Sequence, residues 1–184
     1  RRIAGIAAGG SSMVLSACTG PTYNTFFHNN VLSIGEWFNY RVQRLIMGNA
    51  LAQEFLENEM SPVFRTNGNT DPGTPQYQKF AANQFADWRL RIDGLVDSPT
   101  SYSLAELRAM PSRTQITRHD CVEGWSAIGD WTGTRLSDFL KRVGADLSAK
   151  YVYFICKEGY SNTIDMPTAL HPQTLMVFKF GNEI

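Results

Sequence analysis

The residues most capable of chemistry lie in one short segment, Arg118 to Ser126, which reads Arg-His-Asp-Cys-Val-Glu-Gly-Trp-Ser. Cys121 comes directly after a stretch with strand character, and strand ends commonly present reactive groups. Three kinds of chemistry are open to its thiolate. It could be a nucleophile with His119 as base, a zinc ligand together with His119 and a carboxylate, or one soft ligand to a redox metal otherwise held by a cofactor.

Each of these interpretations makes a different demand on the neighbouring residues. A nucleophile requires His119 and Cys121 on one face of a strand, and no second His or Asn position is identified. The spacing fits no closed zinc site, because a fourth ligand is missing. Glu123 could tune a metal or relay a proton, or it could simply cap a loop. Alternatively, Cys121 is a buried core cysteine beside a satisfied ion pair and has a structural role only.

Local patterns predict the elements that would position this segment. Capping boxes and apolar spacing predict three helices, over 33–58, 103–110 and 137–143. The first begins at the capping box Ser33–Glu36, Pro111 ends the second, and Gly144 ends the third. Alternation predicts strands over 88–93, 115–119 and 175–178, and an apolar run predicts a buried strand over 151–155. Turn residues predict a loop over 67–76. We therefore expect a mixed, β-rich α+β fold.

The composition excludes several classes of protein. The 184 residues suffice for one substantial domain, and 43% of them are hydrophobic. Lys and Arg number 17 and so do Asp and Glu, giving a net charge of zero, which argues against nucleic acid as a partner. The three widely spaced cysteines form no CxxC zinc motif. We found no internal repeat.

The first 18 residues are interpreted as an export signal. Arg1-Arg2 precedes a Gly/Ala-rich, weakly apolar stretch, as in twin-arginine signals, and Leu15-Ser-Ala-Cys18 is similar to a bacterial lipobox. Lipidation of Cys18 would then anchor the protein on the periplasmic side of the cytoplasmic membrane. A Gly/Ala-rich terminus with an incidental cysteine is the alternative. We expect residues 19–60 to be a helical extension and 61–184 to be the main domain.

Five segments occur in the order found in one known family. They are Ser61-Pro-Val-Phe-Arg-Thr-Asn-Gly68 with Asp71-Pro72, Trp88–Val96 with Pro99, Cys121-Val-Glu-Gly-Trp125 followed by Trp131-Thr-Gly133 and Leu136, Lys150–Phe154, and Ile164-Asp165 with His171–Leu175. This order resembles the sulfite-oxidase family of molybdopterin oxidoreductases. Within it, the chain is most similar to the bacterial periplasmic methionine-sulfoxide reductases.

The resemblance implies roles for individual residues. Cys121 would be the protein thiolate on molybdenum, and a molybdopterin cofactor would supply the other ligands. Phe64, Arg65 and Asn67 would lie in the loop that touches the pterin. Cys156 stands where a family member has a pterin-contacting threonine, and a thiol is a weaker hydrogen-bonding group there. Glu123, with Cys121, would belong to the catalytic centre.

The resemblance also implies an activity, the transfer of an oxygen atom and two electrons. Cys-Val-Glu-Gly-Trp lacks the basic residues that follow the cysteine in sulfite oxidases, which favours reduction of a neutral S-oxide or N-oxide. Because the sequence has no CxxCH haem motif, a separate haem cytochrome would supply the electrons. A sulfite-oxidising dehydrogenase and a non-catalytic envelope module that retains the fold are the alternatives.

Family members continue past the region of Asn182 into strands that hold the cofactor phosphate. The resemblance therefore implies that the chain is truncated at its C-terminus. It predicts that residues 1–184 alone bind molybdopterin poorly, and that reading the gene beyond Ile184 would reveal the remaining segment.

Overall fold

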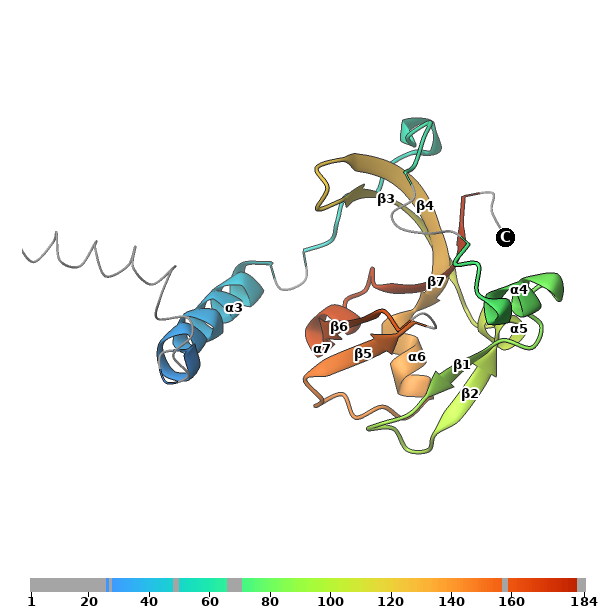
Figure 1. Ribbon diagram of the computed structural model, residues 1–184. Helices are drawn as coiled ribbons and strands as arrows, with labels where there is room; N and C mark the ends of the chain where they lie inside the picture. Colours follow the sequence, from blue (N-terminus) through green and yellow to red (C-terminus); the bar gives the residue numbers. More distant parts are fainter. Residues whose placement is uncertain (1–25, 27, 48–49, 66–70, 157–158, 182–184) are drawn as a thin grey trace, which may run out of the picture. The chain divides into compact units, whose positions relative to one another are not determined.

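The computed structural model describes residues 26, 28–47, 50–65, 71–156 and 159–181 (Figure 1). Its contacts divide the chain into two units, Arg1–Ala50 and Leu51–Ile184. The predicted signal over 1–18, its Cys18, and Asn67 lie outside the described residues. Residues 51–60, which the sequence assigned to the helical extension, are grouped with the second unit.

The first unit contains a π-helical turn, His28–Leu32, followed directly by α3, Ser33–Met47. The prediction of a helix over 33–58 is therefore right at its start and wrong at its end. The predicted cap at Ser33 is also wrong, because helical turns precede it and its hydroxyl donates to the Asn29 carbonyl. Helical periodicity continues past Met47, but residues 52–55 make hydrogen bonds in the second unit instead.

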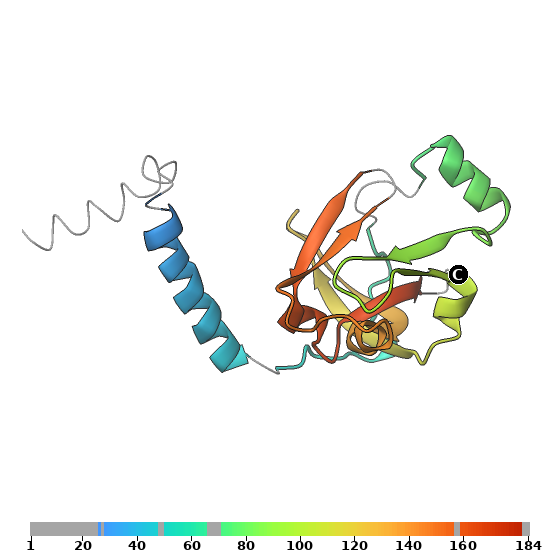
Figure 2. The same cartoon turned by 90° about the horizontal axis from the view of Figure 1, so that it is seen from below.

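The second unit is a mixed α+β domain, as predicted from the sequence (Figures 1 and 2). Its strands pair antiparallel in three small sheets with the orders β1-β2, β3-β4-β7 and β5-β6. The elements are η3 Glu57–Glu59, α4 Pro75–Ala82, β1 Arg89–Ile92, β2 Thr100–Ser103, α5 Leu104–Arg108, β3 Arg113–Asp120, β4 Ser126–Arg135, α6 Leu136–Arg142, β5 Tyr151–Ile155, β6 Ser161–Asp165, α7 Met166–Ala169 and β7 Leu175–Phe180.

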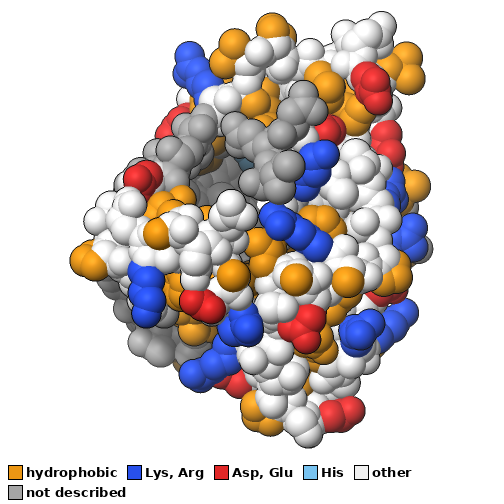
Figure 3. Space-filling model, turned by 90° about the vertical axis from the view of Figure 1, so that its right-hand side faces the viewer, with side chains coloured by type: hydrophobic (Ala, Val, Ile, Leu, Met, Phe, Trp, Pro, Cys, Tyr) orange, Lys and Arg blue, Asp and Glu red, His pale blue; other side chains and the backbone are white. Residues whose placement is uncertain are grey.

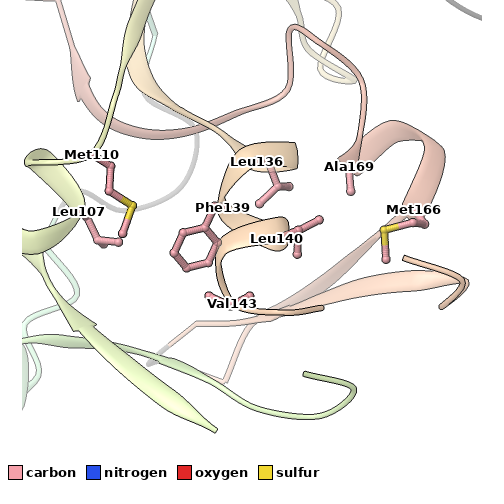
Figure 4. Packing of buried hydrophobic residues seen from close by; sticks show 8 residues of the cluster. All are labelled: Leu107, Met110, Leu136, Phe139, Leu140, Val143, Met166 and Ala169. Carbon is pink, nitrogen blue, oxygen red and sulfur yellow. The ribbon is translucent and has the colours of Figure 1, made fainter. Parts of the chain in front are cut away.

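A compact apolar cluster centred on α6 holds the three sheets together. Figure 4 shows side chains from α6 meeting those of α5 and α7, with Phe139 and Leu140 between them. Each fully buried side chain of this kind contributes about 1.5–3 kcal/mol relative to exposure. The buried members are Leu107, Met110, Leu136, Phe139, Leu140, Val143, Met166 and Ala169.

Several local predictions are confirmed at the ends of elements. Ser103 caps α5, with its hydroxyl accepting from the Glu106 amide at 3.2 Å while Glu106 accepts from the Ser103 amide at 2.7 Å. Gly144 follows the C-cap of α6 with a φ of 62°, a conformation that glycine adopts without strain. The predicted loop over 67–76 is too long, because Pro75 already begins α4.

The β5 strand differs from its prediction in burial. Its span, Tyr151–Ile155, is as expected, but only Val152 is half-buried. An apolar run alone does not distinguish a covered strand from an exposed one. Tyr151, Tyr153 and Ile155 are 63%, 59% and 73% exposed.

Charged groups of both signs share the surface. Figure 3 shows basic and acidic side chains on the same face, with hydrophobic atoms between them. Among the described helices, none combines the length and apolar composition needed to cross a bilayer.

Candidate functional site

Cys121 is the first residue of the loop that joins β3 to β4. Its amide donates to the Trp125 carbonyl at 2.9 Å, and its carbonyl accepts from the Gly124 amide at 3.0 Å. Gly124 has a φ of 87°, which closes the loop in a conformation that L side chains rarely adopt. These two hydrogen bonds fix the backbone around Cys121 at the end of a long hairpin, and its thiol is half-buried there.

An aromatic cluster lies next to this loop, with Phe64 at its centre. The Phe64 ring centroid is 5.9 Å from that of His119, 5.8 Å from Trp125 and 5.4 Å from Trp131. Phe180 of β7 completes the cluster at 4.8 Å. Such edge-to-face and tilted pairs add about 0.5–1.5 kcal/mol each beyond the area they bury.

Gly129 makes room for this cluster on β4. A Cβ at this position would lie 2.7 Å from Cε2 of Phe180 and 3.1 Å from two ring carbons of Phe64. Both rings therefore rest on a strand position that has no side chain. Glycine inside a strand often marks such a close approach.

The segment Leu51–Arg65 carries Phe64 to the hairpin. Glu54 bridges Thr117 on the edge of β3, and the Phe55 amide donates to the Ile116 carbonyl at 2.9 Å. Further along, Ser61 meets β4, where its amide donates to the Ile128 carbonyl at 2.9 Å and its hydroxyl accepts from the Ile128 amide at 2.9 Å. We call residues 51–65 the arm; it contacts both strands of the hairpin.

A buried glutamine anchors the beginning of the arm. Gln173 accepts from the Ala52 amide at 2.7 Å and donates to the Ala52 carbonyl at 2.9 Å, so its amide acts as one more strand partner. Its own carbonyl accepts from the Gln115 side chain at 3.0 Å. Arg113 of β3 adds an ion pair with Glu54.

Polar side chains brace the start of the loop. Arg118 Nε donates to Asp120 Oδ1 at 2.7 Å, and the Ser126 hydroxyl donates to the same oxygen. The hydrogen bond from Ser126, followed by that from Arg118, holds the pKa of Asp120 below its ordinary value. Asp120 is therefore an ionised acceptor that ties the last residue of β3 to the first residue of β4.

Glu123 contacts the aromatic cluster. Its Oε2 accepts from the Trp125 indole N–H at 3.0 Å. This contact fits the capping role that the sequence left open.

A cavity of about 230 Å³ lies on the sheet that carries Cys121. Its lining comes from all three strands and includes Gln115, a residue only 8% exposed. The Gln115 Oε1 is buried and has no hydrogen-bond partner within the described part of the chain. The lining residues are Gln115, Thr117, Arg118, His119, Trp131, Leu175 and Val177.

The structure brings together only some of the predicted site residues. Phe64 lies against the hairpin of Cys121 and Glu123, and Arg65 follows it as an exposed residue. Cys156 is exposed and follows β5, in a sheet separate from that of Cys121. Asn67 lies outside the described residues.

Sequence reasoning missed the residues that support the hairpin. Gly129 carried a usable signal, since an isolated glycine in an otherwise strand-like run indicates a bulge or a close approach. Gln115 and Gln173 carried none, because their pairing joins segments 58 residues apart.

Comparisons with known proteins identify relatives of this chain. The chain is 42% identical over 136 residues to the putative protein-methionine-sulfoxide reductase subunit YedZ1 of Azospira oryzae, covering 70% of this chain and 51% of the relative. It is 34% identical over 113 residues to the protein-methionine-sulfoxide reductase catalytic subunit MsrP of Ralstonia nicotianae, covering 53% of this chain and 34% of the relative. The chain thus spans about half, or less, of these relatives.

A solved structure and a family model complete the comparison. The sulfane dehydrogenase SoxCD from Paracoccus pantotrophus is similar over 52% of this chain and 29% of its own, with a TM-score of 0.46 and 19% identity. Residues 77–184 match the model of the oxidoreductase molybdopterin binding domain. That match covers more than half of the chain, which therefore belongs to the oxidoreductase molybdopterin binding domain family.

Proposed function

We propose that this chain forms the part of a molybdenum-dependent oxidoreductase that presents the protein thiolate, Cys121, and that the enzyme reduces an S-oxide or N-oxide. The observation that carries this proposal is the placement of Cys121. It is a half-buried thiol at the end of a hairpin whose loop is fixed by two backbone hydrogen bonds and by an aromatic cluster.

The donor set around Cys121 fits a metal whose other ligands are not protein side chains. Within the described ranges, no group of three or more His, Cys, Asp or Glu side chains is placed to hold a metal ion. A closed zinc site needs four such ligands, so one thiolate fits better with a metal carried by an organic cofactor.

The Gln115 oxygen supports the same cofactor. A buried acceptor without a partner costs about 1–3 kcal/mol, a cost that a ligand bearing N–H groups would relieve. A pterin ring bears such groups, and the cavity wall that contains Gln115 belongs to the sheet of Cys121. Phe64 and Arg65 of the arm, together with Asn67 and Cys156, are the further proposed contacts.

When bound, molybdopterin with molybdenum supplies a centre that exchanges two electrons and an oxygen atom. The chain's own residues hold and shape the place for it. Cys121 supplies the thiolate, while the Glu123–Trp125 hydrogen bond and the Phe64 ring keep the loop in position. Glu123 is the carboxylate within this loop, and we propose that it accepts or delivers a proton.

The direction of reaction follows from local charge. In the loop itself, Val122 and Gly124 stand where a positive side chain would favour an anionic substrate such as sulfite. A neutral S-oxide suits this loop better, and the two relatives, a putative subunit and a catalytic subunit of protein-methionine-sulfoxide reductases, support that substrate class.

The setting of the enzyme is also a proposal. The Arg1-Arg2 pair and the Leu15–Cys18 segment support export by a twin-arginine signal to the periplasmic side of the cytoplasmic membrane, with a lipid on Cys18. Electrons would come from a separate haem cytochrome.

The test compares Cys121→Ser with Val122→Ala, a change at a fully exposed neighbour in the same loop. Both are made in the complete product of the gene, in cells that synthesise the cofactor. We expect Cys121→Ser to lose methionine-sulfoxide reduction with reduced viologen as electron donor and most of its molybdenum, while Val122→Ala retains both.

Each alternative has its own result. Oxidation of sulfite without reduction of sulfoxides would identify a sulfite dehydrogenase. A metal-free protein whose properties are unchanged by Cys121→Ser would identify a non-catalytic module. Cys156→Ser tests the proposed pterin contact, with a partial loss of molybdenum expected.

A further inference from the structure

The α3 helix exposes an apolar face, and no described residue of its own unit buries it. None of its residues is buried. At 100° per residue, one arc of about 120° collects only apolar side chains and Gly35. On this arc Phe38 is 63% exposed, Leu45 87% and Ile46 72%. The apolar members are Ile34, Phe38, Val42, Leu45 and Ile46.

Two arginines of the same helix stack on aromatic rings, and one of them, Arg41, borders the apolar arc. The Arg41 guanidinium carbon lies 5.4 Å from the Trp37 ring centroid, and that of Arg44 lies 5.3 Å from the Tyr40 centroid. Both pairs have the i, i+4 spacing that places side chains together on a helix. The Arg41–Trp37 pair lies along one edge of the apolar arc, whereas the Arg44–Tyr40 pair lies on the polar side of the helix.

This combination is the pattern of a helix that lies in the plane of a membrane interface. Such helices bury an apolar face at the level of the lipid headgroups, carry Trp or Phe on that face and place Lys or Arg beside it. Trp, here Trp37, prefers the same depth, and an arginine stem such as that of Arg41 extends along apolar surface while the charge stays with the headgroups. We infer that α3 binds the surface of a bilayer that contains anionic phospholipid.

The charge of the helix selects anionic lipid as the partner. The α3 helix contains two basic residues, Arg41 and Arg44, and one acidic residue, Glu36. It is therefore positively charged, whereas the whole chain has no net charge. Attraction to an anionic surface is therefore a local property of this helix. Each arginine near such a surface strengthens binding, and salt weakens the effect.

The dimensions of α3 favour a lipid surface over a second copy of the chain. Its 15 residues extend over about 22 Å at 1.5 Å per residue. This length holds about two heptads, whereas a coiled-coil seam is recognised over three or four. The positions that flank the apolar arc are Asn39 and Arg41, rather than the oppositely charged residues that would pair two helices.

The test mixes the full chain with vesicles of phosphatidylglycerol and phosphatidylcholine, or of phosphatidylcholine alone, and measures sedimentation with the vesicles. We expect binding to the anionic vesicles that weakens with salt. Trp37 emission should shift to shorter wavelength on binding, and that shift should disappear in Trp37→Phe. Failure to bind anionic vesicles would overturn the inference.

Variants of the charged and apolar residues of α3 distinguish binding through this helix from general electrostatic attraction of the protein to the vesicles. Arg41→Ser/Arg44→Ser should lower the partition coefficient about tenfold. The matched control, Arg108→Ser/Arg142→Ser, removes the same charge from the last turns of α5 and α6 and should leave binding unchanged. Phe38→Ser/Leu45→Ser should abolish it.

Two further results would contradict the inference. Equal weakening of vesicle binding by Arg41→Ser/Arg44→Ser and by Arg108→Ser/Arg142→Ser would show general electrostatic attraction that does not depend on α3. Self-association in the absence of vesicles that Phe38→Ser/Leu45→Ser abolishes would show that a second copy covers this face. Circular dichroism of each variant checks that α3 remains helical.

Discussion

Two hairpins of this protein carry nearly the same loop and place it in different surroundings. The β3–β4 loop reads Cys121-Val-Glu-Gly-Trp-Ser126 and the β5–β6 loop reads Cys156-Lys-Glu-Gly-Tyr-Ser161. In both, the cysteine amide donates to the aromatic residue's carbonyl, at 2.9 and 2.7 Å, and the glycine amide donates to the cysteine carbonyl, at 3.0 and 3.1 Å. This short repeat escaped the sequence analysis.

The two loops differ in what packs against them. Cys121 is half-buried, and its Trp125 contacts Phe64 of the arm, whereas Cys156 is exposed and Tyr160 is 67% exposed. The loop sequence therefore sets the two hydrogen bonds that close each loop, while distant segments set the environment of the thiol. A cysteine motif alone does not distinguish these two environments.

Removing the aromatic centre should have the largest effect on this difference. Phe64→Ala deletes a half-buried ring with four aromatic neighbours, and we expect about 2–3 kcal/mol of destabilisation, less than for a fully buried Phe. Denaturant unfolding measures this cost. Peptide-resolved alkylation by mass spectrometry should show Cys121 reacting faster and Cys156 reacting at its original rate.

The matched change on the second hairpin is Tyr153→Ala, at a residue 59% exposed. We expect less than about 1 kcal/mol, because little apolar area returns to water. Equal costs for Phe64→Ala and Tyr153→Ala, or equal acceleration of both thiols, would show that the arm does not distinguish the hairpins.

The glycines of the two loops test what the hairpins share. Gly124 and Gly159 have φ values of 87° and 85°, and a Cβ at either would meet nothing within 4 Å. Gly124→Ala and Gly159→Ala should therefore each lower the free energy of unfolding only by the backbone strain, about 1–2 kcal/mol, and the two losses should be similar. Thermal unfolding of the two variants measures it. A difference larger than about 1 kcal/mol would mean that the surroundings also hold the backbone.

The fold was predictable where local signals decide it. The Ser103 capping box and Gly144 fix the ends of α5 and α6, and their partners lie within a few residues. The β4 strand, Ser126–Arg135, was not predicted, because Gly129 and Gly133 weaken its strand pattern. At Gly133 a Cβ would lie 2.2 Å from the Met176 carbonyl oxygen. That requirement comes from β7, 43 residues later.

The candidate site was predictable in the position of Cys121 and not in its support. Cys121 at the end of a strand was predicted from neighbouring residues. Its support comes from the arm, where Glu54 pairs with Thr117 and Ser61 with Ile128. Helical periodicity wrongly extended the predicted helix through residues 51–58. This segment pairs instead with the edge of β3, which is distant in sequence.

The smallest predicted effect concerns the residue that precedes each cysteine, Asp120 in the first hairpin and Ile155 in the second. The hydrogen bond from Ser126, then that from Arg118, lowers the pKa of Asp120 from its ordinary value of 3.8. A lowered carboxyl pKa stabilises the folded state above that value, and the contribution is lost as the pH falls through the folded pKa. We therefore expect the first hairpin alone to loosen in acid below pH 3.8.

A carboxyl NMR titration and amide exchange of the two loops measure this difference. Ser126→Ala should raise the pKa of Asp120 at least as much as Arg118→Gln does, because the Ser126 hydrogen bond contributes most. Asp120→Asn should remove the acid dependence of exchange at Trp125 and leave Tyr160 unaffected. An Asp120 pKa at or above 3.8, or equal acid loosening of both loops, would show that the Asp120 bridge is too exposed to distinguish the two hairpins.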